Sequence, residues 1–579
     1  MSPGEVGLRR TNASISVDGT PLPARVFDDL LEMRVARGTR TIGRASLVLA
    51  DRTFSLAENH LQIGSEVKIS ALEPAVEIFA GVVTSLATDI DRDGPRVLVT
   101  AHDKSHVMAR TRTTKTYAQL SAKDIVEQLA GEHRLRAEVT DLRAGKVKET
   151  WFWRADSALG LLDELCDRLG WEWVVAGSTL RVVDVSRLEV PEPTCTLPYG
   201  DVLLRFSAEQ NRPVTTEVTV RGWDPASKRS FTSTSTTPDE DKGFVAPGTS
   251  HVATTVVTRR GARTKAEADE LAAALAAQAA TVTARGRAHF SPQIEPGKAV
   301  KVTGTGPGDG TYYVREVEHV LDGGPLRTSF VAGFRPPALV TDPWSGRGTR
   351  GSVLANGIHT GVVTGVEDPE QLGRVQVKLS SVDDEMSLAW ARVLAPGGGQ
   401  GRGIQWTPEV QDEVLVGFED GDARRPVVLG GLFNEIDLPP VRNHEGSVKT
   451  RTLVSAVGNK IEIGDGADAE YIDLVLHDGT VRLHLGADRV DLEAKDKPVR
   501  ISSGKAEIVL AKDGTITIKG STIKIEADQE VAVQGANVKG TASAGLTLDG
   551  ATTTVKAKSS LKLQSTGVAE LAGSMVKIN

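Results

Sequence analysis

The stretch that decides the fold of the C-terminal region is 514-GTITIKGSTIKIEADQEVAVQGANVKG-540. Pairs of aliphatic residues recur in it, with the two members of a pair separated by one residue and successive pairs starting seven or eight residues apart. Alternate residues of an extended strand lie on one side of it, so each pair predicts a short strand with an apolar side. The pairs here and further along the chain are Ile516 and Ile518, Ile523 and Ile525, Val531 and Val533, Leu546 and Leu548, and Leu561 and Leu563.

This region cannot close a globular core by itself. No Phe, Trp or Tyr follows Tyr471 and no Pro follows Pro498, so the side chains that could point inward are small or β-branched. Repeating units of this kind bury their apolar sides by stacking on neighbours. The favoured prediction is a narrow β-prism of several identical chains wound together, with the aliphatic pairs on its axis. A single-chain solenoid is the alternative, although such folds usually have longer repeats and a capping element.

Bulk composition limits the function classes. A chain of 579 residues predicts three to five domains. The formal net charge of −8 argues against a nucleic-acid partner. Two cysteines, Cys166 and Cys195, do not make a disulfide framework. The N-terminus lacks the apolar core of a signal peptide, so we expect synthesis and assembly in the cytoplasm.

The N-terminal half predicts strands with three helices between them. Residues 15–103 alternate apolar and polar positions between turn residues. Helices are predicted over 121–132 with Ser121 as N-cap, over 156–169 with Gly170 after the end, and over 264–280 with Thr264 and Glu267 as a capping box.

Two patterns resemble metal sites but have more ordinary interpretations. The stretch DIDRDG over 89–94 copies half of a calcium loop, yet the position of the bidentate acid is held by Thr100. A hairpin turn is favoured. His102 and His106 lie four residues apart at a strand end with no third ligand, which favours surface histidines.

Two further patterns resemble ligand sites. GTGPGDG over 304–310 lies between two predicted strands, whereas a phosphate loop opens a helix, so a hairpin loop is predicted. The tryptophans that flank the second helix suggest a sugar platform, but core packing is favoured; they are Trp151, Trp153, Trp171 and Trp173. No motif for a hydrolase, phosphate or zinc site is found, so we predict no enzyme, cofactor or metal.

The most specific signal lies between 361 and 434. GVVTGVEDPEQLGRVQVKL, SLAWARVLAP and WTPEVQDEVLVGFEDGDARRPVVLGGLFN predict a small closed barrel of the OB type. Their spelling resembles the barrel of VgrG-type spike proteins and phage tail needles. The residues that carry the resemblance are Asp368, Pro369, Gly373, Arg374, Trp390, Arg392, Pro408, Glu413, Gly421, Asp422, Pro426 and Gly430.

The resemblance extends more weakly over nearly the whole chain. It implies a mainly β fold: a tube-like barrel hub with a small α/β insert, an OB barrel and a trimeric intertwined β-helix. The expected parts are a first hub barrel over 1–105, an insert over 106–200, a second barrel over 201–338, a linker over 339–356, the OB domain over 357–436, a linker over 437–455 and the shaft over 456–579. Two departures are noted: the family often has Gly at Gln411, and residues 395–403 form a glycine-rich loop.

The resemblance implies a structural spike of a contractile injection system. Three copies of two hub barrels would match a hexameric inner tube, and the three tails would form a needle driven through a target envelope by sheath contraction. The implied partners are two further copies, the inner tube and baseplate proteins, effector cargo and a separate PAAR-like tip protein. The tip protein is expected to dock on Met575, Val576, Lys577, Ile578 and Asn579.

Three alternatives stay open at this point: a tail-associated cell-wall hydrolase, a VgrG spike of a type VI secretion system, and an adhesin that binds sugars through the tryptophans. The missing insert and missing motifs argue against the hydrolase. The C-terminus without an effector domain and the loop departures favour a phage-tail-like injection particle, which can be released outside the cell.

Overall fold

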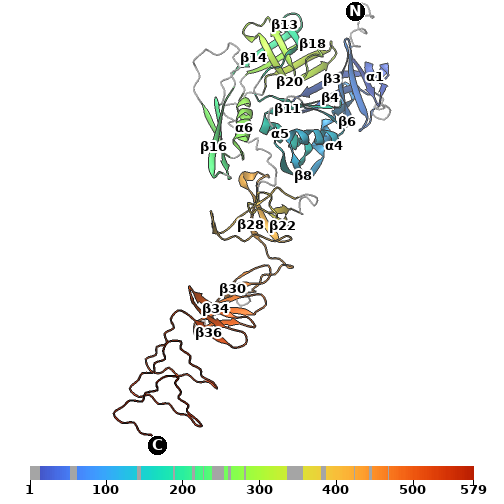
Figure 1. The fold of residues 1–579 in the computed structure, drawn as a ribbon. Helices are drawn as coiled ribbons and strands as arrows, with labels where there is room; N and C mark the ends of the chain where they lie inside the picture. Colours follow the sequence, from blue (N-terminus) through green and yellow to red (C-terminus); the bar gives the residue numbers. More distant parts are fainter. Residues whose placement is uncertain are drawn as a thin grey trace, which may run out of the picture. The chain divides into compact units, whose positions relative to one another are not determined.

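The computed structural model describes residues 13–52, 61–139, 145–186, 189–210, 215–225, 227–237, 253–258, 262–279, 282–334, 357–379, 387–422, 424–442, 446–466 and 469–578 (Figure 1). The chain divides into two compact units, Met1–Pro439 and Pro440–Asn579. The predicted linker over 339–356 lies outside the described residues. The description resumes at residue 357, where the OB domain was predicted to begin. The predicted domain bounds otherwise stay predictions.

One large sheet builds the hub in the first unit. Its strand order is β14-β18-β21-β20-β3-β4-β7-β6-β5-β1-β2, with β13 pairing β19 and β19 pairing β20. The strands are β1 (Ala13–Val17), β2 (Thr20–Pro21), β3 (Leu30–Gly38), β4 (Thr41–Ala50), β5 (Glu66–Leu72), β6 (Ala75–Asp91), β7 (Gly94–His102), β13 (Pro193–Pro198), β14 (Leu203–Gln210), β18 (Val282–His289), β19 (Ala299–Thr303), β20 (Gly310–Leu321) and β21 (Arg327–Ala332).

This sheet contributes to two separate apolar cores. One core gathers inward residues of the N-terminal strands, such as Val35, Leu47 and Val99. The other gathers inward residues of the later strands, such as Val300, Val314 and Phe330. Antiparallel pairing of β20 with β3 joins the two halves into one sheet. A short helix, α1 (Ala24–Asp28), follows β2, and a 3-10 turn over Gly306–Gly308 lies in the loop before β20.

An α/β insert follows the first set of strands. Its elements are α3 (Ser105–Arg110), β8 (Arg112–Leu120), α4 (Ala122–Glu132), β9 (Arg136–Val139), β10 (Glu149–Ser157), α5 (Ala158–Leu169), β11 (Trp171–Ala176) and β12 (Thr179–Asp184). The apolar sides of α4 and α5 share one core with β11 and β12. Ser121 caps α4 as predicted, because its hydroxyl accepts a hydrogen bond from the Asp124 N–H. The Ser121 N–H in turn donates to the Asp124 carboxylate.

The second predicted helix starts later than expected. Asp156 belongs to β10, and α5 begins at Ala158 because the Ser157 hydroxyl accepts a hydrogen bond from the Gly160 N–H. The helix ends at Leu169, followed by Gly170 with φ of 71°, the left-handed conformation expected after a helix end.

The third helix is α6 (Lys265–Ala277), which covers a sheet of β15 (Glu217–Asp224), β16 (Arg229–Thr236) and β17 (Thr254–Val257) (Figure 1). Thr264 accepts a hydrogen bond from the Glu267 N–H, as a capping box requires. The reciprocal bond differs from the prediction, because Glu267 Oε2 accepts from the Arg263 N–H instead of that of Thr264.

The OB domain is a five-stranded sheet in the order β23-β22-β27-β28-β24. Its core is aliphatic and includes Val363, Val377, Val414 and Val428. The glycine-rich 395–403 loop folds as a hairpin of two short strands. The elements are β22 (His359–Gly365), β23 (Gln376–Lys378), β24 (Arg392–Val393), β25 (Gly398–Gly399), β26 (Arg402–Gly403), β27 (Glu413–Phe418), a 3-10 turn (Glu419–Gly421) and β28 (Pro426–Gly431).

The second unit begins with antiparallel sheets. The strands are β29 (Thr450–Val454), β30 (Lys460–Gly466), β31 (Ala469–Val475), β32 (Val481–Gly486) and β33 (Val490–Ala494) in one sheet, and β34 (Val499–Ser503), β35 (Ala506–Leu510) and β36 (Ile516–Lys519) in another. Strand β29 lies within residues 437–455, which were predicted as a linker, and it pairs with β30. An intertwined shaft was predicted over 456–579. In the structure, strands β30 to β36 of this range pair with strands of the same chain.

After β36 the chain zigzags (Figure 1). Bends recur at 521, 528–529, 536, 543–544, 551–552, 558–559, 566–567 and 574, which reproduces the spacing of seven or eight residues seen in the sequence. Over the described residues 520–578 no strand pairs with another strand of the same chain. The backbone groups of these extended segments are therefore available to other chains.

Candidate functional site

The second unit presents an uncovered apolar face, defined here as two rows of aliphatic residues on the β29–β33 sheet. Cross-strand pairing aligns the residues of each row directly opposite one another. Apart from Leu483, their exposed fractions are 39–68%. The first row is Leu453, Ile461, Leu474, Leu483 and Leu492, and the second is Ile463, Ile472, Leu485 and Val490.

The opposite face of this sheet is polar and internally satisfied. Arg482 donates two hydrogen bonds to Asp473, at 3.2 and 2.8 Å, and His484 Nδ1 lies 2.7 Å from Asp473 Oδ1. Tyr471 donates from its hydroxyl to Glu462 at 2.7 Å. Burial alone would raise the pKa of Asp473, but its partners Arg482 and His484 lower it. The polar face is thus complete in one chain, whereas the apolar face lacks a partner.

The apolar side continues along the unit. In the β34–β36 sheet, Ile501, Ile508 and Ile518 are cross-strand neighbours, and all three are exposed. Beyond β36, each predicted pair falls within one extended segment between two bends. The ten residues predicted as the shaft core, from Ile516 to Leu563, are 52–78% exposed in the single chain.

Nine aliphatic side chains lie together on this face, and we expect such a surface to contact other chains. Burying one large aliphatic side chain completely stabilises a protein by about 1.5–3 kcal/mol, and soluble monomers rarely expose contiguous apolar patches of more than a few hundred Å². Sequence reasoning named the pairs after 516 but missed the two rows of the β29–β33 sheet. The alternation in KIEIG, YIDLV and VRLHL was the available signal.

Replacing one residue of the apolar face should weaken self-association. In Leu474→Asp, a carboxylate would enter an apolar contact without a partner, which costs several kcal/mol per copy. We expect the mass measured by light scattering at micromolar concentration to fall toward the 61.5 kDa monomer. The matched control is Glu493→Gln on the polar face, which should keep the wild-type mass. An unchanged mass for Leu474→Asp would contradict this assignment.

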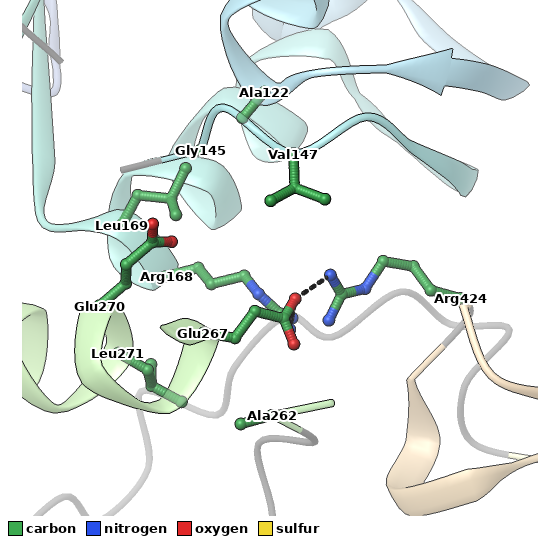
Figure 2. Close-up of a pocket in the computed structure, with 10 residues that line it drawn as sticks. All are labelled: Ala122, Gly145, Val147, Arg168, Leu169, Ala262, Glu267, Glu270, Leu271 and Arg424. Carbon is green, nitrogen blue, oxygen red and sulfur yellow. Dashed lines mark hydrogen bonds and ion pairs between the residues drawn. The ribbon is translucent and has the colours of Figure 1, made fainter. Parts of the chain in front are cut away.

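A second candidate site lies within the first unit, where the OB domain meets α5 and α6 (Figure 2). Arg424, in the turn before β28, is 2% exposed in its side chain, donates from Nη1 to Glu267 Oε1 at 2.6 Å, and pairs with Asp422 at 2.8 Å. Arg168 of α5 lies 3.6 Å from Asp422 and 3.8 Å from Glu267. We call these four residues the junction network.

The junction network balances two cations against two anions. Burial alone would raise the pKa of both acids, but Arg424 and Arg168 lower the pKa of Glu267 and hold that of Asp422 well below its usual range. Both carboxylates are therefore ionised at neutral pH. The sequence resemblance had pointed to Asp422, whereas Glu267 had been assigned to a helix cap and Arg168 had not been singled out.

Removing Arg424 should destabilise the first unit strongly. Arg424→Ala leaves two buried carboxylates without their main partner, and breaking a buried pair in this way costs about 3–5 kcal/mol. The control is Arg392→Ala, whose side chain is 53% exposed and pairs with Glu419, so its loss should cost under about 1 kcal/mol. Urea unfolding of both variants measures the difference, and equal losses would contradict the role given to the network.

Several OB motif residues stabilise turns of the barrel through hydrogen bonds or positive φ angles. Asp368 accepts hydrogen bonds from the N–H groups of Glu370, Leu372 and Arg374 and from the Arg374 guanidinium, and these lower its pKa well below the usual range. Gly373 and Gly421 adopt positive φ of 70°. Asn434 donates to Glu413 at 2.6 Å.

The remaining motif residues, Pro369, Trp390, Arg392, Pro408, Pro426 and Gly430, are spread over the turns and strands of the domain. The described structure therefore does not bring the motif together as one reactive cluster. Its arrangement supports a structural interpretation of the motif, with Asp368 and Arg374 as its most fully connected pair.

Gln411 is a strained substitute for glycine. Its φ is 82°, in the left-handed region that favours glycine, and its N–H donates to Val363 O at 2.8 Å. Gln411→Gly should relieve this strain and raise the free energy of unfolding by about 1 kcal/mol, measured by urea denaturation. Gln411→Ala keeps a Cβ and should bring no gain. A loss of stability in the glycine variant would contradict the strain argument.

The patterns that resembled ligand sites have structural roles. The 89–94 stretch forms the β6–β7 hairpin turn, and 304–310 connects β19 to β20. Trp171 and Trp173 are buried in the insert core, while the side chains of Trp151 and Trp153 lie outside the described residues.

The histidine pair does not form a metal cluster. His102 Nδ1 contacts Thr84 Oγ1, and His106 Nδ1 contacts the carbonyl of Asp103. Among the residues that the structure describes, no group of three or more His, Cys, Asp or Glu side chains is arranged to hold a metal ion. No helix in the described ranges is long and apolar enough to cross a membrane.

Known families match two parts of the chain. Residues 9–322 match the family described as the Alg8 N-terminal domain, which covers more than half of the chain. Residues 359–433 match the type VI secretion system/phage-baseplate injector OB domain.

Curated relatives are spike proteins of Pseudomonas aeruginosa. The type VI secretion system spike protein VgrG5 is 35% identical over 161 residues, which are 25% of this chain and 19% of that protein. The type VI secretion system spike protein VgrG4b is 28% identical over 194 residues, 32% of this chain and 22% of that protein. This chain therefore spans about a fifth of the length of these relatives.

Solved structures share the fold. A chain of the Francisella PdpA-VgrG complex, in its half-lidded form, aligns over 83% of this chain and 88% of that chain, with a TM-score of 0.52 and 8% identity. The lidless form of the complex gives a TM-score of 0.50 over 83% of this chain and 98% of that chain, with 9% identity. The chain belongs to the Alg8 N-terminal domain family, and it carries an OB domain similar to that of type VI secretion system and phage-baseplate injectors.

Proposed function

We propose that the chain is the central spike of a contractile injection system baseplate and works as a homotrimer. The observation that carries this proposal is the uncovered apolar face, followed by extended segments with no strand pairing in the described residues 520–578. Three copies supply three apolar faces that can close around one axis. Such closure pairs strand edges that would otherwise aggregate.

The hub supports the same stoichiometry. Each chain carries two barrel cores in one continuous sheet, so three chains offer six barrels. A ring of six barrels would match a hexameric inner tube, while the OB domain and shaft keep threefold symmetry. Inner tube and baseplate proteins are the partners on this side, and effector cargo would travel with the spike.

A separate tip protein would complete the needle. Met575, Val576 and Ile578 are large apolar side chains that are exposed in the single chain, and Lys577 is exposed beside them. Asn579, also predicted for this contact, lies outside the described residues. We propose that a PAAR-like protein covers these side chains.

Assembly would occur in the cytoplasm, and the loop departures favour a phage-tail-like injection particle over a type VI apparatus. The spike would pierce a target envelope mechanically when the sheath contracts, without catalysis of its own. A tail-associated hydrolase is the competing proposal.

Location within the particle tests the proposal. An antibody fragment against the OB domain, imaged by electron microscopy on purified injection particles, should mark one end on the central axis. Labelling of lateral fibres would contradict the spike role and favour an adhesin. In parallel, the purified chain should release no soluble fragments from peptidoglycan. Steady release above that of a buffer-only control would favour the hydrolase.

A further inference from the structure

One carboxyl oxygen at the hub–OB junction is buried without a hydrogen-bond partner, on the half-buried residue Glu164. Glu164 lies on α5, one turn before Arg168, and its Oε2 atom is buried with no hydrogen-bond partner among the described residues. A buried polar atom without a partner is unfavourable, and far more so when it is charged. The local structure therefore favours the neutral form of this side chain.

Charged groups face Glu164 from two elements. Asp167 and Arg168 lie on its own helix, and Asp422 and Arg424 come from the OB turn. Glu267 of α6 forms ion pairs with both arginines, Arg168 and Arg424, and so offsets part of their positive charge. The two cations are already matched by Glu267 and Asp422, so an ionised Glu164 adds an unmatched negative charge.

The balance of these effects favours protonation near neutrality. Burial raises the pKa of Glu164 to about 7, although Arg168 and Arg424 pull it down, while Asp422 and Asp167 push it up. In a separated hub and OB domain, solvent would return the carboxyl toward its ordinary value of about 4.3. The docked arrangement then binds one more proton than the separated one between these two values.

We propose that Glu164 is a proton-controlled latch, which holds the OB domain against α5 and α6 when neutral and loosens the junction when ionised. The sign follows from proton linkage: docking is strongest below about pH 4.5, weakens as the pH rises, and reaches its minimum above about pH 7. This device is independent of the proposed spike function, because it concerns contacts within one chain.

Hydrogen exchange of the full-length protein tests the latch. Peptides covering 264–270 and 419–426 report the junction, and their protection is compared at pH 5.5 and pH 8 after correction for the intrinsic pH dependence of exchange. We expect protection to fall roughly tenfold or more at the higher pH. Glu164→Gln, which imitates the neutral form, should keep high protection at both values.

Two variants provide controls. Glu127→Gln on the exposed side of α4 should follow the wild-type pH profile, and Arg424→Ala should show low protection at both pH values. Wild-type protection that does not change with pH would overturn the proposal without any variant. A Glu164→Gln protein that folds but titrates like the wild type would overturn it as well.

Discussion

An apolar surface that one chain cannot cover is the constraint on which the rest of this architecture depends. The β29–β33 sheet satisfies its polar face internally through Asp473, Arg482 and His484, yet its aliphatic rows face outward. Past Lys519 the chain supplies extended segments with aliphatic pairs and small side chains, and no aromatic ring occurs that would widen a narrow core. Burial of apolar area drives association, so we propose that folding and assembly of this unit are one process.

In the first unit, two different kinds of contact join the parts of one chain. Strand β20 binds the two barrel halves through backbone pairing with β3. The OB domain is joined through charge instead, with Arg424 buried against Glu267 and Asp422. A buried ionic network adds little stability over an apolar contact but fails sharply when one member is removed or changes its charge. We propose that such a junction specifies one docked geometry and responds to protonation.

Sequence reasoning predicted local structure well where the signal was local. Ser121 was predicted as an N-cap from residues within one helical turn, and the spacing of the aliphatic pairs that begin at Ile516, Ile523 and Val531 predicted the period of the bends. The OB barrel was predicted from its sequence motif, and residues 359–433 match an OB-domain family. The junction network was missed because its members, Arg168, Glu267 and Arg424, are far apart in sequence and become neighbours only through folding. Glu267 was assigned to a cap for the same reason: its local pattern fitted one, while its side chain also binds a distant arginine.

The mass of the intact wild-type chain in solution tests the central claim most directly. Light scattering or native mass spectrometry at micromolar concentration should give three times the chain mass of 61.5 kDa, with no concentration dependence over a tenfold dilution. A stable, folded species at 61.5 kDa would contradict the account, because the aliphatic rows and pairs of the second unit would then be exposed to water without a partner.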